Sequence, residues 1–265
     1  MSDLVTVEVD GGVADVRLNR PEKYNALSPE MFKAIMAAGE RLAEAKEVRA
    51  VVLSGNGRGF CAGLDMASMQ GLGDSDRDAG DALLSRGDQE ENFAQRPAYV
   101  WKKLPVPTIA ALHGVAYGGG CQIALGADIR FAAPDAKISV MEIKWGLIPD
   151  MSITQTLRDL VPLDVAKELT FTGRVLNGEQ ARQAGLVTHV ADDPHAAAME
   201  LAREIAGKSP DAVRAGKDLF ETSWHADART GLELEAALQR KLIGTPNQVE
   251  AVKANFEKRP PEFND

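Results

Sequence analysis

The feature that most constrains the fold of this 265-residue chain is a run of three glycines, Gly118-Gly119-Gly120, shortly after an apolar stretch. The stretch 108–112 (TIAAL) is typical of a buried strand. Glycine has no Cβ, so another backbone or a ligand can approach this turn closely. A helix that begins at the glycines would direct its free N–H groups toward a negatively charged oxygen. We therefore expect the main chain itself to form a binding site here.

The composition is that of a globular protein, and its charge excludes some partners. Hydrophobic residues make up 45% and charged residues 26% of the chain, enough for one large α/β domain or a core with an appendage. The net charge of −9 opposes general binding to nucleic acids or anionic membranes. The sequence shows no signal-peptide pattern at Met1–Val5 and no apolar run of the roughly 18 residues that a membrane helix needs. We expect a cytoplasmic protein with neither nucleic-acid nor membrane partners.

The first part of the chain alternates strand and helix patterns. Val5–Val9 and Val13–Leu18 flank Asp10-Gly11-Gly12, which predicts a β-hairpin. Ser28-Pro29 predicts the start of a helix that runs to about residue 46, and 48–54 is a β-branched run that predicts a buried strand. This order predicts an α/β fold. Further helices are predicted at 93–104 and 151–160, and strands at 108–112, 128–132 and 139–143.

The pattern becomes almost wholly helical after Asp192-Asp193-Pro194. We therefore predict a core over 1–193 and a helical oligomerisation region over 194–265, with helices at 196–208, 210–221, 231–243 and 246–256. The Gly-, Asp- and Ser-rich stretch 70–91 is either a flap over a site or a plain surface loop.

Several chemistry-bearing motifs do not occur in the sequence. There is no Gly-x-x-x-x-Gly-Lys-Ser/Thr phosphate loop, no Gly-x-Gly-x-x-Gly dinucleotide motif and no Gly-x-Ser-x-Gly nucleophile elbow. The four histidines form no pair with metal-ligand spacing, and Cys61 and Cys121 are typical of small buried residues. Nucleotide hydrolysis, hydride transfer and metal binding therefore lose support.

Five motifs, taken together and in this order, resemble the crotonase superfamily, the enoyl-CoA hydratases and isomerases. They lie at 19–27, 59–66, 113–121, 127–130 and 146–149. The resemblance runs from about Val5 to the C-terminus. It implies a crotonase-like spiral of β-β-α units, a helical C-terminal trimerisation region and a homotrimer or a hexamer made of two trimers. It also implies an acyl-CoA thioester substrate, in which coenzyme A is part of the substrate and no separate cofactor is needed.

The resemblance implies positions for substrate contacts as well. The backbone N–H groups of Leu64 and Gly119 match the pair that holds the thioester carbonyl in this superfamily, and two such donors would stabilise the enolate formed next to a thioester. Lys258 matches a basic position that approaches the nucleotide phosphates, with a solvated basic helix end as the alternative. The remaining positions that the resemblance places along the substrate and coenzyme A are Lys23, Ala26, Leu27, Ala62, Asp65 and Met66.

Positions 122, 142 and 150 distinguish the reactions of the superfamily. Similarity to the hydratases would require glutamate at 122 and 142 and a small residue at 150, whereas this chain has Gln122, Glu142 and Asp150. A glutamine amide cannot act as a general acid or base near neutral pH. The pair Glu142 and Asp150 instead resembles the dienoyl-CoA isomerases, although those enzymes usually carry aspartate at position 122.

We therefore expect a double-bond shift in an unsaturated acyl-CoA, with Asp150 removing a proton beside the carbonyl and Glu142 returning one further along the chain. Gln122 is expected to support Glu142 by a hydrogen bond. Glu142 needs surroundings that raise its pKa, and Met141, Ile143 and Trp145 are the predicted source. Two alternatives remain. One is an enoyl-CoA hydratase or single-bond isomerase in which Glu142 does most of the proton transfer and Gln122 orients water. The other is a non-catalytic acyl-CoA-binding protein.

Overall fold

The computed structural model describes residues 4–65, 84–86 and 90–265, which are built around a six-stranded sheet of order β1-β2-β3-β4-β6-β8. β1 and β2 form the predicted antiparallel hairpin, and every other neighbouring pair in this sheet is parallel. A second, two-stranded parallel sheet joins β5 to β7. The strands are β1 (Val5–Asp10), β2 (Val13–Leu18), β3 (Ala50–Gly55), β4 (Thr108–Leu112), β5 (Val115–Tyr117), β6 (Ile129–Ala132), β7 (Lys137–Ser139) and β8 (His189–Val190).

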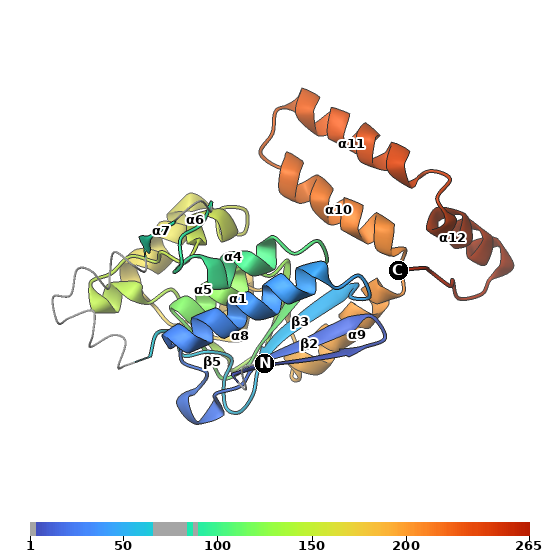
Figure 1. Ribbon diagram of the computed structural model, residues 1–265. Coiled ribbons are helices and arrows are strands. Elements are labelled where there is room, and N and C mark those ends of the chain that lie inside the picture. The colour runs from blue at the N-terminus through green and yellow to red at the C-terminus, as the bar shows by residue number, and fades with distance from the viewer. Residues whose placement is uncertain (1–3, 66–83, 87–89) are drawn as a thin grey trace.

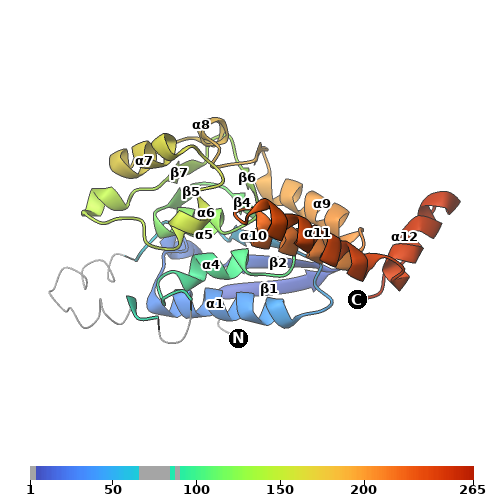
Figure 2. The ribbon, with the colours of Figure 1, turned by 90° about the horizontal axis from the view of Figure 1, so that it is seen from above.

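Helices cover both faces of the large sheet, so its central strands are apolar on both sides. α1 (Pro29–Glu44), α4 (Arg96–Lys102) and α5 (Gly119–Leu125) lie over one face and α9 (Pro194–Ala206) over the other (Figures 1 and 2). Strand β3 shows the alternation, because Val51 and Leu53 pack under the first layer while Ala50 and Val52 pack against α9. This architecture is the predicted α/β fold.

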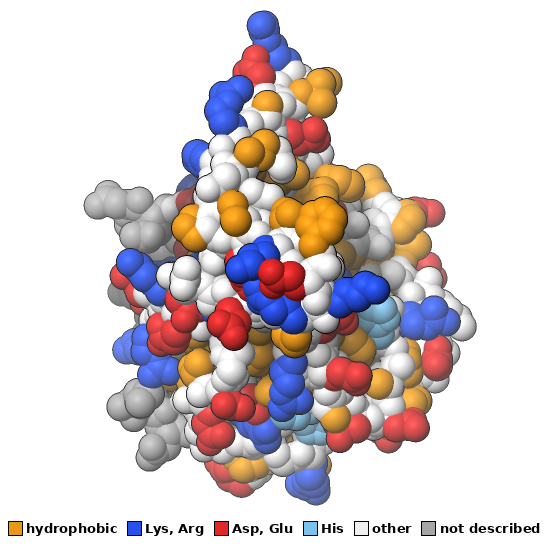
Figure 3. All heavy atoms as spheres, turned by 90° about the vertical axis from the view of Figure 1, so that its right-hand side faces the viewer, with side chains coloured by type: hydrophobic (Ala, Val, Ile, Leu, Met, Phe, Trp, Pro, Cys, Tyr) orange, Lys and Arg blue, Asp and Glu red, His pale blue; other side chains and the backbone are white. Residues whose placement is uncertain are grey.

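The helix α9 packs on the large sheet, although the sequence pattern groups it with the helices after residue 193. Ala198, Ala202 and Ala206 recur every fourth residue and are buried against β2, β3 and β4. α9 is therefore part of the core, and the helical extension begins after Gly207. The extension consists of α10 (Pro210–Ser223), α11 (Ala228–Leu242) and α12 (Pro246–Glu257) (Figure 1). Exposed hydrophobic side chains lie among charged ones on the end of the molecule that carries these helices (Figure 3).

The segment 139–160 also differs from prediction. Instead of the expected strand 139–143, the strand in this region is β7, which ends at Ser139. It ends there because its partner β5 ends at Tyr117 and the chain then turns at Gly118, whose N–H donates to Ser139 O at 3.0 Å. A 3-10 helix, η2 (Glu142–Trp145), follows. The helix expected at 151–160 is only α6 (Ile153–Thr156), since Ser152 has a left-handed backbone. Helices α7 (Leu163–Thr172) and α8 (Gly178–Ala184) and the 3-10 helix η1 (Pro21–Lys23) had no predicted counterpart.

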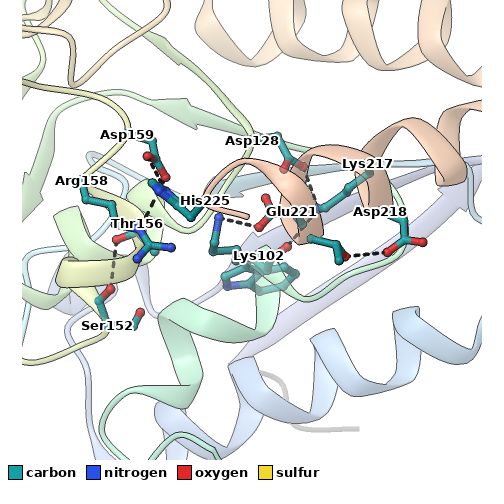
Figure 4. A network of polar contacts seen from close by, with 12 residues as sticks. Lys102, Asp128, Ser152, Thr156, Arg158, Asp159, Lys217, Asp218, Glu221 and His225 are labelled. Carbon is teal, nitrogen blue, oxygen red and sulfur yellow. Dashed lines mark hydrogen bonds and ion pairs between the residues drawn. The ribbon is translucent and has the colours of Figure 1, made fainter. Parts of the chain in front are cut away.

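A buried ion pair anchors α10 to the sheet. Lys217 Nζ lies 2.8 Å from Asp128 Oδ2 and donates to Val106 O at 3.1 Å. The same carboxylate oxygen accepts from the backbone N–H of Thr108 at 2.7 Å, at the start of β4. Figure 4 shows the ion pair of Lys217 with Asp128 beside that of Lys102 with Glu221. The first turns of the extension are thus tied to the residues from which β4 and β6 begin.

Replacing Lys217 with methionine should destabilise the protein. Removing one partner of a fully buried pair costs about 3–5 kcal/mol, and because the Asp128 side chain is 24% exposed we expect about 2 kcal/mol. The measurement is the free energy of unfolding in urea. The matched control is Lys208→Met, whose lysine forms an exposed pair with Glu204 and should change stability by less than about 0.5 kcal/mol. Equal losses in the two variants would contradict the anchoring role.

Candidate functional site

The triple-glycine turn begins α5, as predicted, and it leaves no room for side chains. Gly118 has φ of +51°, and α5 starts at Gly119. A Cβ on Gly120 would lie 2.4 Å from Cys61 O, and one on Gly119 would lie 2.7 Å from Met151 Sδ. Glycine is therefore required by close approach as well as by backbone angle. The first N–H groups of α5 have no partner within the helix itself, as at the start of any α-helix.

The segment 61–65 runs between the glycine turn and the segment 25–27. Cys61 pairs with Ala116 on one side, and Leu64 pairs with Leu27 on the other. The N–H of Leu27 donates to Gly63 O and its carbonyl accepts from the N–H of Asp65, so the alternation of an extended chain points the N–H of Leu64 away from Leu27. A Cβ on Gly63 would lie 3.6 Å from Gly119 N. The structure thus brings the backbones of Leu64 and Gly119 together.

Gln122, Glu142 and the residue after Asp150 form one hydrogen-bonded group beside this turn. Gln122 is fully buried on α5, and its Nε2 donates to Glu142 Oε1 at 2.6 Å. Its Oε1 accepts from the backbone N–H of Met151 at 2.8 Å. Glu142 Oε2 is buried and has no hydrogen-bond partner in the described part of the chain. The expected contact between Gln122 and Glu142 is therefore present, and one carboxylate oxygen stays uncommitted.

Both carboxyl groups have a raised pKa. Burial is the main cause for Glu142; the hydrogen bond from Gln122 lowers its pKa, and the charge of Asp150 raises it further. The Asp150 side chain is open to solvent on one side, and the protein around its other sides raises its pKa by desolvation. The predicted source of burial was wrong in part, since Ile143 and Trp145 are 44% and 46% exposed. Glu142 instead lies against the glycine turn, because a Cβ on Gly118 would be 3.3 Å from its Oε1.

The residues predicted to lie along coenzyme A differ in their exposure to solvent. Lys23 is exposed at the end of η1, whereas Ala26 and Leu27 are buried beneath it. Ala62 is half-buried and its N–H donates to Tyr24 O at 2.9 Å. Ala62 belongs to the segment 61–65, and Leu27 pairs with that segment and lies against the glycine turn, where a Cβ on Gly119 would be 2.9 Å from its Cδ1. Met66 lies outside the described residues, as do 70–83 and 87–89 of the loop expected to be a flap or a surface loop.

Two residues predicted to contact the substrate, Asp65 and Lys258, have other partners or another place in the structure. Asp65 forms an ion pair with Arg20 at 2.6 Å, so its carboxylate joins two segments of the protein. Lys258 caps the C-terminus of α12, which lies beyond α10 and far from β5 and α5 (Figures 1 and 2). Within a single chain, Lys258 is therefore not brought to the other candidate residues.

Sequence reasoning missed residues that hold the site in shape. Asn25 has φ of +55° and is fully buried; its side-chain amide donates to Gly59 O and Phe60 O, which fixes the segment 61–65. Asparagine tolerates this backbone region, so its place in a tight turn was an available signal. Ser152 has φ of +63°, and its buried Oγ has no partner among the described residues. No local sequence pattern marks this serine.

Other features lie apart from this group. A cavity of about 500 Å³ lies between α10 and the ends of α5 and α6, and its lining includes none of residues 64, 119, 122, 142 and 150. Across residues 4–65, 84–86 and 90–265 no three His, Cys, Asp or Glu side chains are arranged to hold a metal ion. In the same ranges no helix combines the length and the apolar character needed to cross a membrane.

Comparisons with known proteins agree on one family. The family described as Enoyl-CoA hydratase/isomerase matches residues 8–265. Methylglutaconyl-CoA hydratase of Mus musculus is 35% identical over 97% of this chain and 81% of its own. A probable enoyl-CoA hydratase of Mycobacterium tuberculosis is 32% identical over 98% of both chains. The crystal structure of enoyl-CoA hydratase from Bacillus anthracis superposes with a TM-score of 0.89 at 30% identity and 98% coverage of both chains. These relatives are named hydratases rather than dienoyl-CoA isomerases.

Ser152→Gly should stabilise the protein. A left-handed backbone costs a non-glycine residue roughly 1 kcal/mol, and the change also removes a buried hydroxyl without a partner among the described residues. The free energy of unfolding is expected to rise by about 1 kcal/mol. Gly244→Ser is the converse control, because Gly244 has φ of +80° and nothing lies within 4 Å of the place its Cβ would take, so it should lose a similar amount. A destabilised Ser152→Gly variant would show that the hydroxyl has a partner in solution.

Glu142→Gln should stabilise the folded protein more at neutral than at acidic pH. A carboxyl whose pKa is raised by folding binds more protons in the folded state, so its contribution to stability falls as pH rises above about 4, the unfolded value, through the raised pKa. Glutamine removes that loss. Unfolding free energies measured between pH 4 and pH 8 should therefore diverge from wild type as pH rises. The exposed control Glu233→Gln should stay within about 0.5 kcal/mol throughout. A gain that is constant with pH would contradict the raised pKa.

Proposed function

Because the chain belongs to the enoyl-CoA hydratase/isomerase family, we propose that it adds water to the double bond of a 2-enoyl-CoA thioester, with Glu142 as the group that moves the proton. The observation that carries this proposal is the Glu142 carboxyl beside the glycine turn, which is held at Oε1 by Gln122 and has a buried Oε2 with no partner among the described residues. The names of the relatives support hydration as well. Hydration, an alternative on the sequence alone, therefore becomes the first choice over isomerisation.

The thioester carbonyl would accept hydrogen bonds from the N–H groups of Leu64 and Gly119. Both groups belong to backbones that meet at the glycine turn, where side chains are excluded. Attack on the double bond moves negative charge onto the carbonyl oxygen, and fixed donors stabilise that charge in the transition state. Loss of one such donor typically costs about 3 kcal/mol of barrier.

The proton steps balance with a single carboxylate. Ionised Glu142 takes a proton from water while the water oxygen bonds to the β-carbon and the electron pair of the double bond moves to the carbonyl oxygen. The resulting enolate then takes that proton from Glu142 at its α-carbon, so that H and OH have been added. Gln122 contributes by holding Glu142, to which its Nε2 donates one N–H, while its Oε1 accepts from the N–H of Met151.

A double-bond shift is the second candidate, and Asp150 is the observation that favours it. This second carboxylate acts electrostatically on Glu142, and in the chain it directly precedes Met151, whose N–H donates to Gln122. Asp150 would remove a proton beside the carbonyl of a dienoyl-CoA, and Glu142 would return one at the far end of the conjugated enolate. Gln122, which carries no acid or base, fits this reaction as well as hydration.

The proposal extends to coenzyme A and to assembly. Lys23, Ala26, Leu27 and Ala62 would border the coenzyme A moiety of the substrate, and no separate cofactor is needed. Exposed apolar residues on the extension, such as Phe220, Trp224 and Phe256, would be covered in a homotrimer or hexamer. Lys258 would then reach the phosphates of coenzyme A bound to a neighbouring subunit.

The two reactions and the non-catalytic alternative are separated by one panel of assays. Hydration is followed by loss of 2-enoyl-CoA absorbance, with crotonyl-CoA and 3-methylglutaconyl-CoA as substrates, and isomerisation by the appearance of a conjugated diene from 3,5-dienoyl-CoA. Glu142→Gln should lower hydration by about 10²–10⁴-fold, the usual contribution of a general acid–base group. Asp150→Asn should leave hydration within about tenfold of wild type.

Three other results of these assays would contradict the proposed hydration. Diene formation that is faster than hydration in the wild type and lost in Asp150→Asn would put isomerisation first. Binding of the thioesters without turnover of any of them would support the non-catalytic alternative. Hydration that survives Glu142→Gln would remove Glu142 from the reaction.

A further inference from the structure

We propose that Gln122 is a positioning residue whose amide holds two loops by hydrogen bonds of opposite direction and so leaves Glu142 Oε2 as the oxygen that exchanges the proton. The two loops are η2, which carries Glu142, and the stretch 149–152, which carries Asp150. The proposal rests on the proposed function for the identity of the substrate, but its geometry belongs to the protein alone.

The direction of the amide is fixed by its partners. The backbone N–H of Met151 can only donate, so the side-chain atom 2.8 Å from it must be the carbonyl oxygen of Gln122. The Nε2 group must then face Glu142, where it donates to Oε1. No rotation of the amide by 180° satisfies both neighbours, because it would set nitrogen against an N–H group and oxygen against a carboxylate.

The same contact selects between the oxygens of Glu142. Oε1 lies between the amide of Gln122 and the glycine turn, where a Cβ on Gly118 would be 3.3 Å away. Oε2 is buried without a partner in the described part of the chain. A buried oxygen that makes no hydrogen bond is unfavourable unless a ligand fills the place. Oε2, and not Oε1, is therefore the oxygen that lacks a partner among the described residues.

Glutamate at position 122 could make both of these hydrogen bonds only while the pair of carboxyls holds a proton. Its carboxylate could accept from Met151, but it could donate to Glu142 only when protonated. Two carboxylates in such close contact cannot both be ionised without strong repulsion, so they would share a proton and titrate as a pair. The amide supplies a donor without a charge and without a titration of its own.

Among the described residues, few other ionisable groups act on Glu142. Asp150 lies on the adjoining loop, and the Cys121 thiol on α5 is affected by the charge of Glu142 and by Arg130. Lys144, on η2 itself, is exposed and lies over the ring of Trp145. The charged residues Asp164, Lys167 and Glu168 of α7, which packs against η2, are exposed to solvent. A pH effect at position 122 will therefore report chiefly on Glu142 and Asp150.

The test compares Gln122→Glu, which keeps the acceptor and has a donor only when protonated, with Gln122→Met, which has neither. The ratio of Gln122→Glu to wild-type kcat/KM should rise at least about tenfold from pH 8 to pH 5, as the shared proton restores the bond. Gln122→Met should stay about 100-fold below wild type across the range. The surface pair Gln239→Glu and Gln239→Met controls for charge and shape, and unfolding midpoints at each pH confirm that every variant is folded. A flat ratio for Gln122→Glu would overturn the proposal.

A second measurement needs no turnover, so the proposal can be tested even if the proposed function fails. The side-chain carboxyls of the glutamates are labelled with ¹³C, and Glu142 is assigned by the signal missing from Glu142→Gln. In Gln122→Met the Glu142 carboxyl should titrate at higher pH than in wild type, because the lost hydrogen bond stabilises the ionised form. An unchanged titration would overturn the positioning role. If the wild type shifts double bonds or binds thioesters without turnover, only the proposed function is affected.

Discussion

The candidate site depends on the close approach of three stretches of main chain, 25–27, 61–65 and 115–120. A Cβ on Gly63 would lie 2.7 Å from Tyr117 O, and one on Gly120 would lie 2.4 Å from Cys61 O. These distances are too short for any side chain. The middle stretch can therefore pair with both neighbours only because glycine stands at these positions. The pairing in turn brings the backbones of Leu64 and Gly119 together, and the carboxyl of Glu142 lies against the neighbouring Gly118.

The elements of the fold that depend on local sequence patterns could be predicted. The hairpin around Asp10-Gly11-Gly12, the helix after Ser28-Pro29 and the helix that starts at the triple glycine each follow from turn, cap and backbone preferences. The resemblance of the motifs to the crotonase superfamily supplied the overall fold, which periodicity alone would not give. The segment 139–160 was predicted less well, because its shape depends on where β5 ends and on Ser152.

The surroundings of Glu142 show why burial is harder to predict than secondary structure. Neighbours in sequence suggested that Ile143 and Trp145 would desolvate the carboxyl, yet both are exposed in this chain. Its burial comes from residues about twenty positions away, namely the glycine turn and Gln122. Similarly, the alanine spacing of α9 was visible in the sequence, but its packing on the sheet was not, because a helix pattern does not reveal which surface will cover it.

The position of Leu64, between Leu27 and the glycine turn, has a consequence for how the reaction of such a protein can change in evolution. The backbone N–H of Leu64 survives every point substitution except proline, since each other amino acid supplies it, whereas the N–H of Gly119 stays tied to glycine by the close contacts of the turn. Side chains at 122, 142 and 150 have no such protection. Successive replacements at those three positions could exchange one reaction for another while the carbonyl stays bound, so a duplicated gene would begin with a working thioester site and need to acquire only new proton chemistry.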